Sequence, residues 1–171
     1  MLGRIPYRSY WMVPTLLVGL ALGALMPHSP LHAVATDRTD SFALATGALD
    51  DVTEAVYLLD FTTGELHAYA ISSVTRRFNA FFHANAQGDM GIVDARNPQY
   101  LLVTGNSLFR PNAGALQPAN SVIYVAELTS GKLAAYNIPW SPSFSQSGTP
   151  VRKAMNCLDV IPFRAPSVAR R

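Results

Sequence analysis

Short stretches whose side chains alternate between two faces fill the chain after residue 35, and this period of two is typical of β-strands. β-Branched and aromatic residues are frequent in these stretches, as strands prefer, and turn-forming residues separate them. The pattern predicts strands at 42–46, 55–61, 65–71, 78–83, 100–104, 121–128, 132–138 and, in the C-terminal segment, 157–162. We therefore expect an all-β domain.

Two of these regions repeat one another. Residues 56–71 align without gaps on residues 123–138, and seven of the sixteen positions are identical, where average composition gives roughly one. A shorter echo precedes each copy, at 42–47 and at 100–105. The offset between the copies grows from 58 residues at the echo to 67 at the longer match. The second copy therefore carries nine extra residues, which follow its echo.

Each longer copy has the pattern of a β-hairpin. A Thr-Thr-Gly turn ending at Gly64 and a Thr-Ser-Gly turn ending at Gly131 join the two strands, and glycine enters the left-handed region that such a turn needs without steric cost. Both faces of these strands are largely apolar, as expected of sheets covered on both sides. The copies thus define two meanders of four short strands, at 42–83 and at 100–138, with 157–162 as the last strand of the second.

The hairpin sequence, a Tyr- or Val-rich strand, an acidic residue, Thr/Ser-Gly-Lys/Glu and a second strand, resembles the blade hairpin of quinoprotein-type and related β-propellers. The likeness covers about half of the chain after residue 35, and four short strands match the size of one blade. Propellers close with about four or more blades, whereas this chain has two units. The resemblance therefore implies either a sandwich of two units or a partial propeller that several chains complete.

The first thirty-five residues predict a signal peptide or an N-terminal membrane anchor. Arg4 and Arg8 precede an apolar run at 11–26. Its length lies between the roughly 7–15 residues of a secretory core and the roughly 20 of a spanning helix. The small-x-small pattern Ala-Val-Ala at 33–35 fits a signal-peptidase site. Cleavage there would release the domain outside the cytoplasm, and retention would anchor it in the membrane through residues 11–26.

This leader, the opening at 36–47 and the hairpin at 124–131 are together similar to uncharacterised exported proteins of planctomycete bacteria. The resemblance implies a periplasmic or extracytoplasmic location and a lineage, and no particular activity. The expected organisation is a leader at 1–35, a β-rich domain at 36–140, and a Pro/Ser-rich, extended segment with a basic tail at 141–171.

Charge and cysteine content narrow the classes of function. Residues 36–149 hold ten acids and six bases, a net charge of −4, while residues 150–171 hold five bases and one acid, a net charge of +4. The basic character is therefore a property of the tail, and no basic face for nucleic acid is visible on the domain. The single Cys157 cannot form an internal disulfide, so its thiol is either buried and inert or pairs between chains, and its strand-like surroundings favour burial.

The densest acidic cluster, Asp50, Asp51 and Glu54, offers three carboxylates that could hold Ca²⁺. Its spacing matches no calcium loop, and acidic residues in a strand connection are also ordinary turn chemistry. His67 and His83 have no second His or Cys at metal-ligand spacing along the chain.

The nine extra residues of the second copy make the segment 106–120 the longest loop inside the domain, and long loops are often functional. Phe109 and Arg110 lie next to each other in this loop, and aromatic and Arg side chains dominate binding surfaces. The alternative is a mobile surface loop. Trp140 is a third binding candidate, and it could equally pack onto the sheet as a structural clasp.

We therefore predict an exported, non-enzymatic module of the cell envelope that binds another macromolecule or its own copies. No cofactor and no nucleic acid is expected. One alternative is a metal-dependent or quinoprotein-like enzyme or enzyme subunit, in which the acidic cluster and a histidine converge. Another is a membrane-anchored accessory of an envelope complex.

Overall fold

The computed structural model of the chain describes residue 17 and residues 36–93, 98–110 and 113–164. The chain divides into two compact parts, residues 1–31 and residues 32–171, and only Leu17 of the first part is described. The predicted leader and its apolar run thus lie outside the described residues, apart from Leu17. In the described ranges, no helix is both long enough and apolar enough to cross a membrane.

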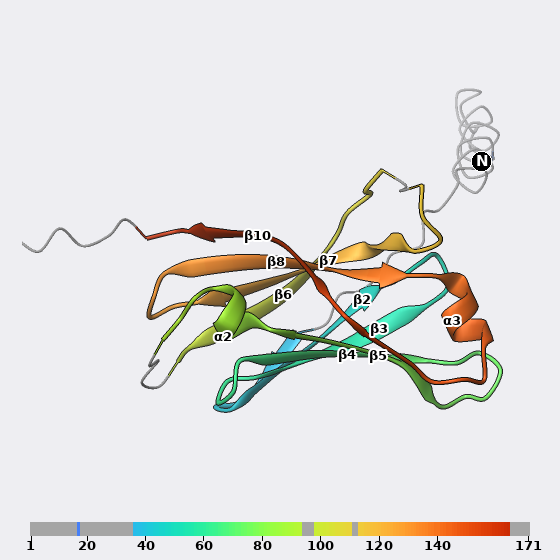
Figure 1. Ribbon diagram of the computed structural model, residues 1–171, viewed down its shortest axis with the longest axis horizontal. Helices are drawn as coiled ribbons and strands as arrows, with labels where there is room; N and C mark the ends of the chain where they lie inside the picture. Colours follow the sequence, from blue (N-terminus) through green and yellow to red (C-terminus); the bar gives the residue numbers. More distant parts are fainter. Residues whose placement is uncertain (1–16, 18–35, 94–97, 111–112, 165–171) are drawn as a thin grey trace, which may run out of the picture. The chain divides into compact units, whose positions relative to one another are not determined.

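The described part of residues 32–171 is built from two β-sheets (Figure 1). The larger sheet has the strand order β1-β2-β3-β4-β5-β9, and the smaller has the order β10-β8-β7-β6. Neighbouring strands are antiparallel except β5 and β9, which are parallel. The strands of the larger sheet are β1 (Thr36–Arg38), β2 (Phe42–Ala48), β3 (Glu54–Asp60), β4 (Glu65–Ile71), β5 (Phe78–Asn85) and β9 (Val151–Ala154). Those of the smaller sheet are β6 (Tyr100–Asn106), β7 (Gln117–Glu127), β8 (Lys132–Trp140) and β10 (Asn156–Pro162). Two short helices, α2 (Ala86–Asp89) and α3 (Pro142–Gln146), lie in the connections.

The all-β prediction is confirmed, and each predicted strand corresponds to one of β2–β8 or β10. The hairpin turns also form as predicted: Gly64 has a φ of 71° and Gly131 a φ of 69°. At these angles a residue with a Cβ is strained, so the turns favour glycine.

The C-terminal segment contributes more structure than its sequence pattern predicts. Its Pro/Ser-rich stretch, expected to be extended, forms the helix α3 instead, with Pro142 in the first turn where proline is tolerated. The chain then adds β9 to the edge of the larger sheet and continues as β10 beside β8 in the smaller one. Met155, between the two strands, is buried in the core. This segment therefore joins the edges of both sheets.

Two further expectations need correction. Cys157 lies in a strand, as predicted, but its side chain is exposed rather than buried because β10 is an edge strand of the smaller sheet. The loop predicted at 106–120 is shorter, because β7 already begins at Gln117 and pairs there with Trp140. The extra residues of the second copy thus lengthen a strand as well as a loop.

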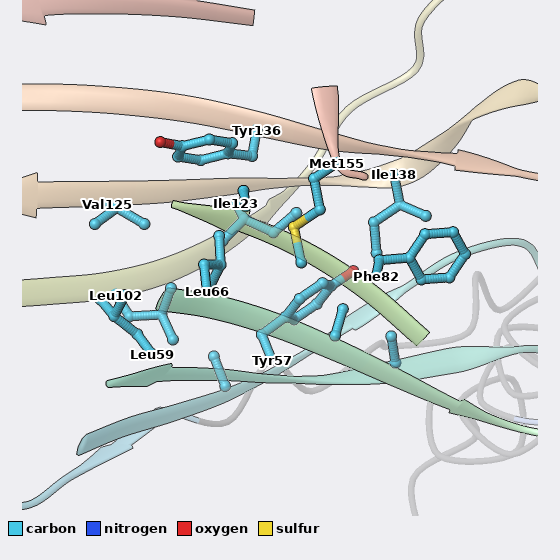
Figure 2. Close-up of a cluster of buried hydrophobic side chains, with 14 of the residues drawn as sticks. Tyr57, Leu59, Leu66, Phe82, Leu102, Ile123, Val125, Tyr136, Ile138 and Met155 are labelled. Carbon is cyan, nitrogen blue, oxygen red and sulfur yellow. The ribbon is translucent and has the colours of Figure 1, made fainter. Parts of the chain in front are cut away.

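The hydrophobic core lies between the two sheets (Figure 2). Polar contacts also cross it. The Tyr57 hydroxyl lies 2.8 Å from the Ser121 hydroxyl, and the Thr104 hydroxyl donates to the carbonyl of Thr46, so β6 lies beside β2. The labelled core side chains are Tyr57, Leu59, Leu66 and Phe82 from the larger sheet, Leu102, Ile123, Val125, Tyr136 and Ile138 from the smaller sheet, and Met155.

The two hairpins have the same strand register. Tyr57 pairs with Ala68 between β3 and β4, and their repeat counterparts, Tyr124 and Ala135, pair between β7 and β8. The hairpins nevertheless bury opposite faces. Tyr57 is fully buried in the core, whereas Tyr124 is 40% exposed on the outside of the smaller sheet.

The same exchange holds along the rest of the repeat. In the echo strands, Leu102 of β6 is 2% exposed, whereas its counterpart Leu44 of β2 is 44% exposed. In the returning strands of the hairpins, Leu66 is fully buried, whereas its counterpart Leu133 lies on the outward surface. The two repeat units, β2–β5 and β6–β8 with β10, therefore meet through non-equivalent faces. The front of one unit packs on the back of the other.

Candidate functional site

The outward surface of the larger sheet, which we call the six-strand face, is mainly apolar and aromatic. Strand pairing arranges its side chains in rows that cross the sheet. Phe42 and Leu44 at one end are 43% and 44% exposed, so this surface is open to solvent. One row consists of Leu44, Leu58, His67 and His83, and the next of Thr46, Val56, Tyr69, Phe81 and Arg152.

Aromatic contacts order the middle of the six-strand face. The Tyr69 ring lies 6.1 Å from the His67 ring in a stacked arrangement and 6.0 Å from the Phe81 ring in an edge-on arrangement. The Arg152 guanidinium lies 4.5 Å above the centre of the Phe81 ring, a cation–π contact. A cationic group thus marks the β9 edge of this mainly apolar surface.

The outward surface of the smaller sheet, which we call the four-strand face, is also mainly apolar. Val103 is 52% exposed, Tyr124 40% and Ile161 47%. Val103, Tyr124, Ala135 and Asp159 form a row across β6, β7, β8 and β10. An exposed apolar sheet of this kind is characteristic of an interaction surface.

The sequence pattern indicates that both faces of the strands are apolar, but it does not predict that, among the described residues, the outward face of each sheet is exposed. It also missed the pairing of His67 with His83, which are directly opposite each other on β4 and β5. Their separation in sequence carries no ligand spacing, and only the strand pairing brings them together. Two imidazoles alone do not complete a metal site, and in the described residues no group of three His, Cys, Asp or Glu side chains could hold a metal ion.

Asp50 and Asp51 of the acidic cluster lie in the turn between β2 and β3, and Glu54 begins β3. Asp50 has a structural role. One of its carboxylate oxygens accepts hydrogen bonds from the backbone N–H groups of Val52 and Thr53, at 3.0 and 2.7 Å. The other accepts the indole N–H of Trp140 at 2.7 Å. Burial raises the pKa of Asp50, but these hydrogen bonds outweigh it and bring the pKa below its usual value. Both oxygens of Asp50 are thus already bound.

Trp140 is the structural clasp rather than an open platform. Its side chain is 2% exposed, and its ring makes an edge-on contact with Phe144 of α3 and a tilted contact with Phe82. Together with the bond to Asp50, these contacts tie the end of the second hairpin to the first repeat unit, residues 42–83. No face of the indole is left for a ligand.

The structure brings the acidic turn close to Asn120 of β7 and to the first residues of the long loop. Asn120 donates its backbone N–H to the Leu49 carbonyl at 3.0 Å and its side-chain N–H to Asp51 at 3.4 Å. A shallow depression lies between the turn and the loop, lined by Ala48, Asp50, Asp51, Asn106, Ser107, Leu108 and Asn120. Glu54 is not among the residues that line it.

The loop itself presents two of the predicted binding residues to solvent. Phe109 is 38% exposed and Arg110 is also exposed, beside the fully solvated Leu108. Their role in binding remains a prediction. The loop adds apolar surface next to the depression.

Two other ionisable groups have structural explanations. Partial desolvation of the Cys157 thiol by its neighbours, and the nearby Asp89, raise the pKa of the thiol, which disfavours the reactive thiolate. The fully buried Glu127 accepts backbone N–H groups of Gln99, Thr129 and Ser130, at 3.3, 2.9 and 2.6 Å. Burial raises the pKa of Glu127, but these bonds outweigh it and lower the pKa overall. Glu127 thus holds the second hairpin turn.

In comparisons with known proteins, no family model, no curated protein and no solved structure matches this chain. The class of this protein is therefore defined by its fold and by its two outward sheet faces alone. The described residues form a two-sheet all-β domain whose two outward sheet faces are mainly apolar and exposed.

Proposed function

We propose that this protein is an exported, non-enzymatic module of the cell envelope that binds or assembles through its two outward sheet faces. One observation carries the proposal: each open face consists of repeat positions that form the hydrophobic core in the other unit. Leu44 and Leu133 are outward, and their counterparts Leu102 and Leu66 are buried. Surfaces with the composition of a core are stabilised when another protein covers them.

The arrangement of the units supports the finer interpretation of the fold as a partial propeller. In a propeller each blade packs its front on the back of the next one, so equivalent strands bury opposite faces. The exchange between the two hairpins of this chain follows that rule, and the close approach of β2 and β6 resembles the meeting of innermost strands. A sandwich of two units related by a two-fold axis would instead bury equivalent faces.

The groups that usually carry chemistry favour a binding role over an enzymatic one. Asp50 and Glu127 have their carboxylate oxygens engaged by backbone and indole N–H groups, and the pKa of the Cys157 thiol is raised. The export that we propose rests on the leader at 1–35.

Photo-crosslinking in intact cells tests the proposal. A photoreactive phenylalanine analogue replaces Leu44 on the six-strand face or Val103 on the four-strand face, in the full chain with its own N-terminus. We expect discrete crosslinked adducts from both positions and none from Val52, which is 93% exposed in a turn and serves as the control. The adducts should fractionate with the envelope. Absence of adducts from both sheet positions, or adducts confined to the cytoplasm, would overturn the proposal.

A further inference from the structure

We infer that the partner is a second copy of this chain, with the four-strand face of one copy packed on the six-strand face of the next. This inference rests on the proposed function and deepens it by naming the partner and the orientation. It follows from continuity with the interface that already exists between the two sheets.

Each open face is the repeat counterpart of a surface that already packs inside the chain. Leu44 on the six-strand face corresponds to Leu102, which enters the core from the smaller sheet. Leu133 on the four-strand face corresponds to Leu66, which enters the core from the larger sheet. Joining the two open faces therefore repeats the internal interface with the roles of the units exchanged.

The internal contacts also predict how the two faces align. The hydrogen bond from β6 to β2 sets how these strands lie along each other within the chain. The same alignment between copies places Leu44 of one copy against Val103 of the next. The repeat counterparts of this pair are Leu102 and Ala45, and both belong to the buried hydrophobic cluster between the sheets.

Charge complementarity favours the same orientation. Arg152 ends the row of the six-strand face that includes Thr46, and Asp159 ends the row of the four-strand face that includes Val103. Front-to-back stacking in the internal alignment brings the Arg152 guanidinium of one copy near the Asp159 carboxylate of the next. This pairing of opposite charges favours the front-to-back orientation.

A front-to-back contact is heterologous, so it closes into a ring or continues as a filament. Propeller rings contain about four to eight blades. Since each chain supplies two units, we infer a closed ring of about two to four copies. Closure covers both apolar faces of every copy, which a single two-fold contact between equivalent faces cannot do.

Disulfide trapping between differently tagged copies tests the orientation. The full chain, with its own N-terminus, is purified in a mild detergent after Cys157→Ser removes the native thiol. One tagged copy carries Leu44→Cys and the other carries Val103→Cys, and the two are coexpressed and oxidised. We expect the mixed disulfide to predominate over the 44–44 and 103–103 products. Val52→Cys in place of either partner is the matched control and should give little product.

The charge pair supplies a second measurement, by light scattering over a range of concentrations. Arg152→Asp and Asp159→Arg should each weaken association, by about two- to fivefold for a rim ion pair, and the double variant should restore it. The two residues lie on opposite outward faces, so a contact within one chain cannot produce this rescue. Circular dichroism confirms that each variant is folded.

The outcomes separate this inference from the proposed function. A monomer at every concentration, or equal yields of the mixed and identical-site disulfides, would overturn front-to-back stacking. If photo-crosslinked envelope adducts still form but contain another protein, the proposed function stands and self-assembly fails. If the adducts are absent, both fail. If the Leu44 and Val103 variants still associate but show no preference for the mixed disulfide, the contact between copies lies elsewhere, for example in residues 1–35, and the inference fails.

Discussion

The first hairpin, β3–β4, and the second, β7–β8, share their turn, their strand pairing and seven identical residues, yet they present opposite faces to the core. A residue pattern that is apolar on both faces leaves this choice open, and the position of each unit in the chain decides it. The difference shows that burial is a property of the neighbour as much as of the strand. Comparing equivalent positions in the two hairpins therefore isolates the effect of the neighbour.

The largest effect is expected from a leucine that both hairpins share. Leu66→Ala removes a fully buried side chain and should lower the free energy of unfolding by about 2–5 kcal/mol, through lost apolar contact and a cavity. The counterpart substitution, Leu133→Ala, alters an outward position and should cost much less in a dilute sample. Urea denaturation of both variants measures the contrast. Equal losses would mean that the two faces are not distinct in solution.

The turn glycines should respond unequally as well. Gly64→Ala places a Cβ about 2.6 Å from Cβ of Gln87 and about 3.0 Å from its backbone nitrogen in α2, in addition to left-handed strain. We expect a loss of about 2–4 kcal/mol for the combined strain and overpacking. Gly131→Ala meets mainly the Arg164 side chain, which can move, and should cost about 1–2 kcal/mol. Thermal unfolding compares them, and a larger loss at Gly131 would contradict this reasoning.

The sequence predicts the local features of the fold because they depend on near neighbours. Alternation identifies β2–β8, and the glycine of each Thr-Thr-Gly or Thr-Ser-Gly turn identifies where a chain reversal occurs. The face that each unit buries could not be predicted, because Tyr57 and Tyr124 have the same local surroundings and differ only in the sheet opposite them. The parallel strand β9 was missed because four residues give too short a pattern.

The same distinction applies to the candidate site. Turn chemistry at Asp50 was predictable from its acidic dipeptide, but its bond to Trp140 joins residues ninety positions apart. The pairing of His67 with His83 depends on strand register, and the open faces depend on the packing of whole sheets. Local patterns therefore identify which residues can contribute to a surface, and tertiary contacts decide which of them do.

The acidic residues that precede the two turns provide a smaller, pH-dependent contrast. Glu127→Gln removes an acceptor from a buried cluster of backbone N–H groups, and we expect a loss of about 1–3 kcal/mol at pH 7. The pKa of Glu127 is lowered in the folded state. Its stabilisation is therefore present above the unfolded-state pKa of about 4.3 and is lost as the pH falls through the folded-state pKa.

Urea denaturation at several pH values measures this difference between Glu127→Gln and the native chain. The difference should shrink below about pH 4 as the native carboxylate becomes protonated. Asp60→Asn is the matched control. Asp60 occupies the same repeat position, accepts one N–H group from Thr62 at 2.8 Å and is only half-buried, so its substitution should change stability little. A difference for Glu127→Gln that grows on acidification would contradict the assigned role.

The smallest contrast concerns the clasp that joins the two units. Asp50→Asn keeps the shape of the side chain but replaces one acceptor oxygen with an N–H donor, which cannot satisfy both the turn and the Trp140 indole. We expect a loss of about 1 kcal/mol, whereas Asp51→Asn, next to it on the exposed side of the turn, should remain close to the native chain. Because Trp140 packs between Phe82 and Phe144, the change should also shift tryptophan fluorescence only for the Asp50 variant. An equal shift for both variants would show that the indole responds to turn charge in general rather than to the hydrogen bond.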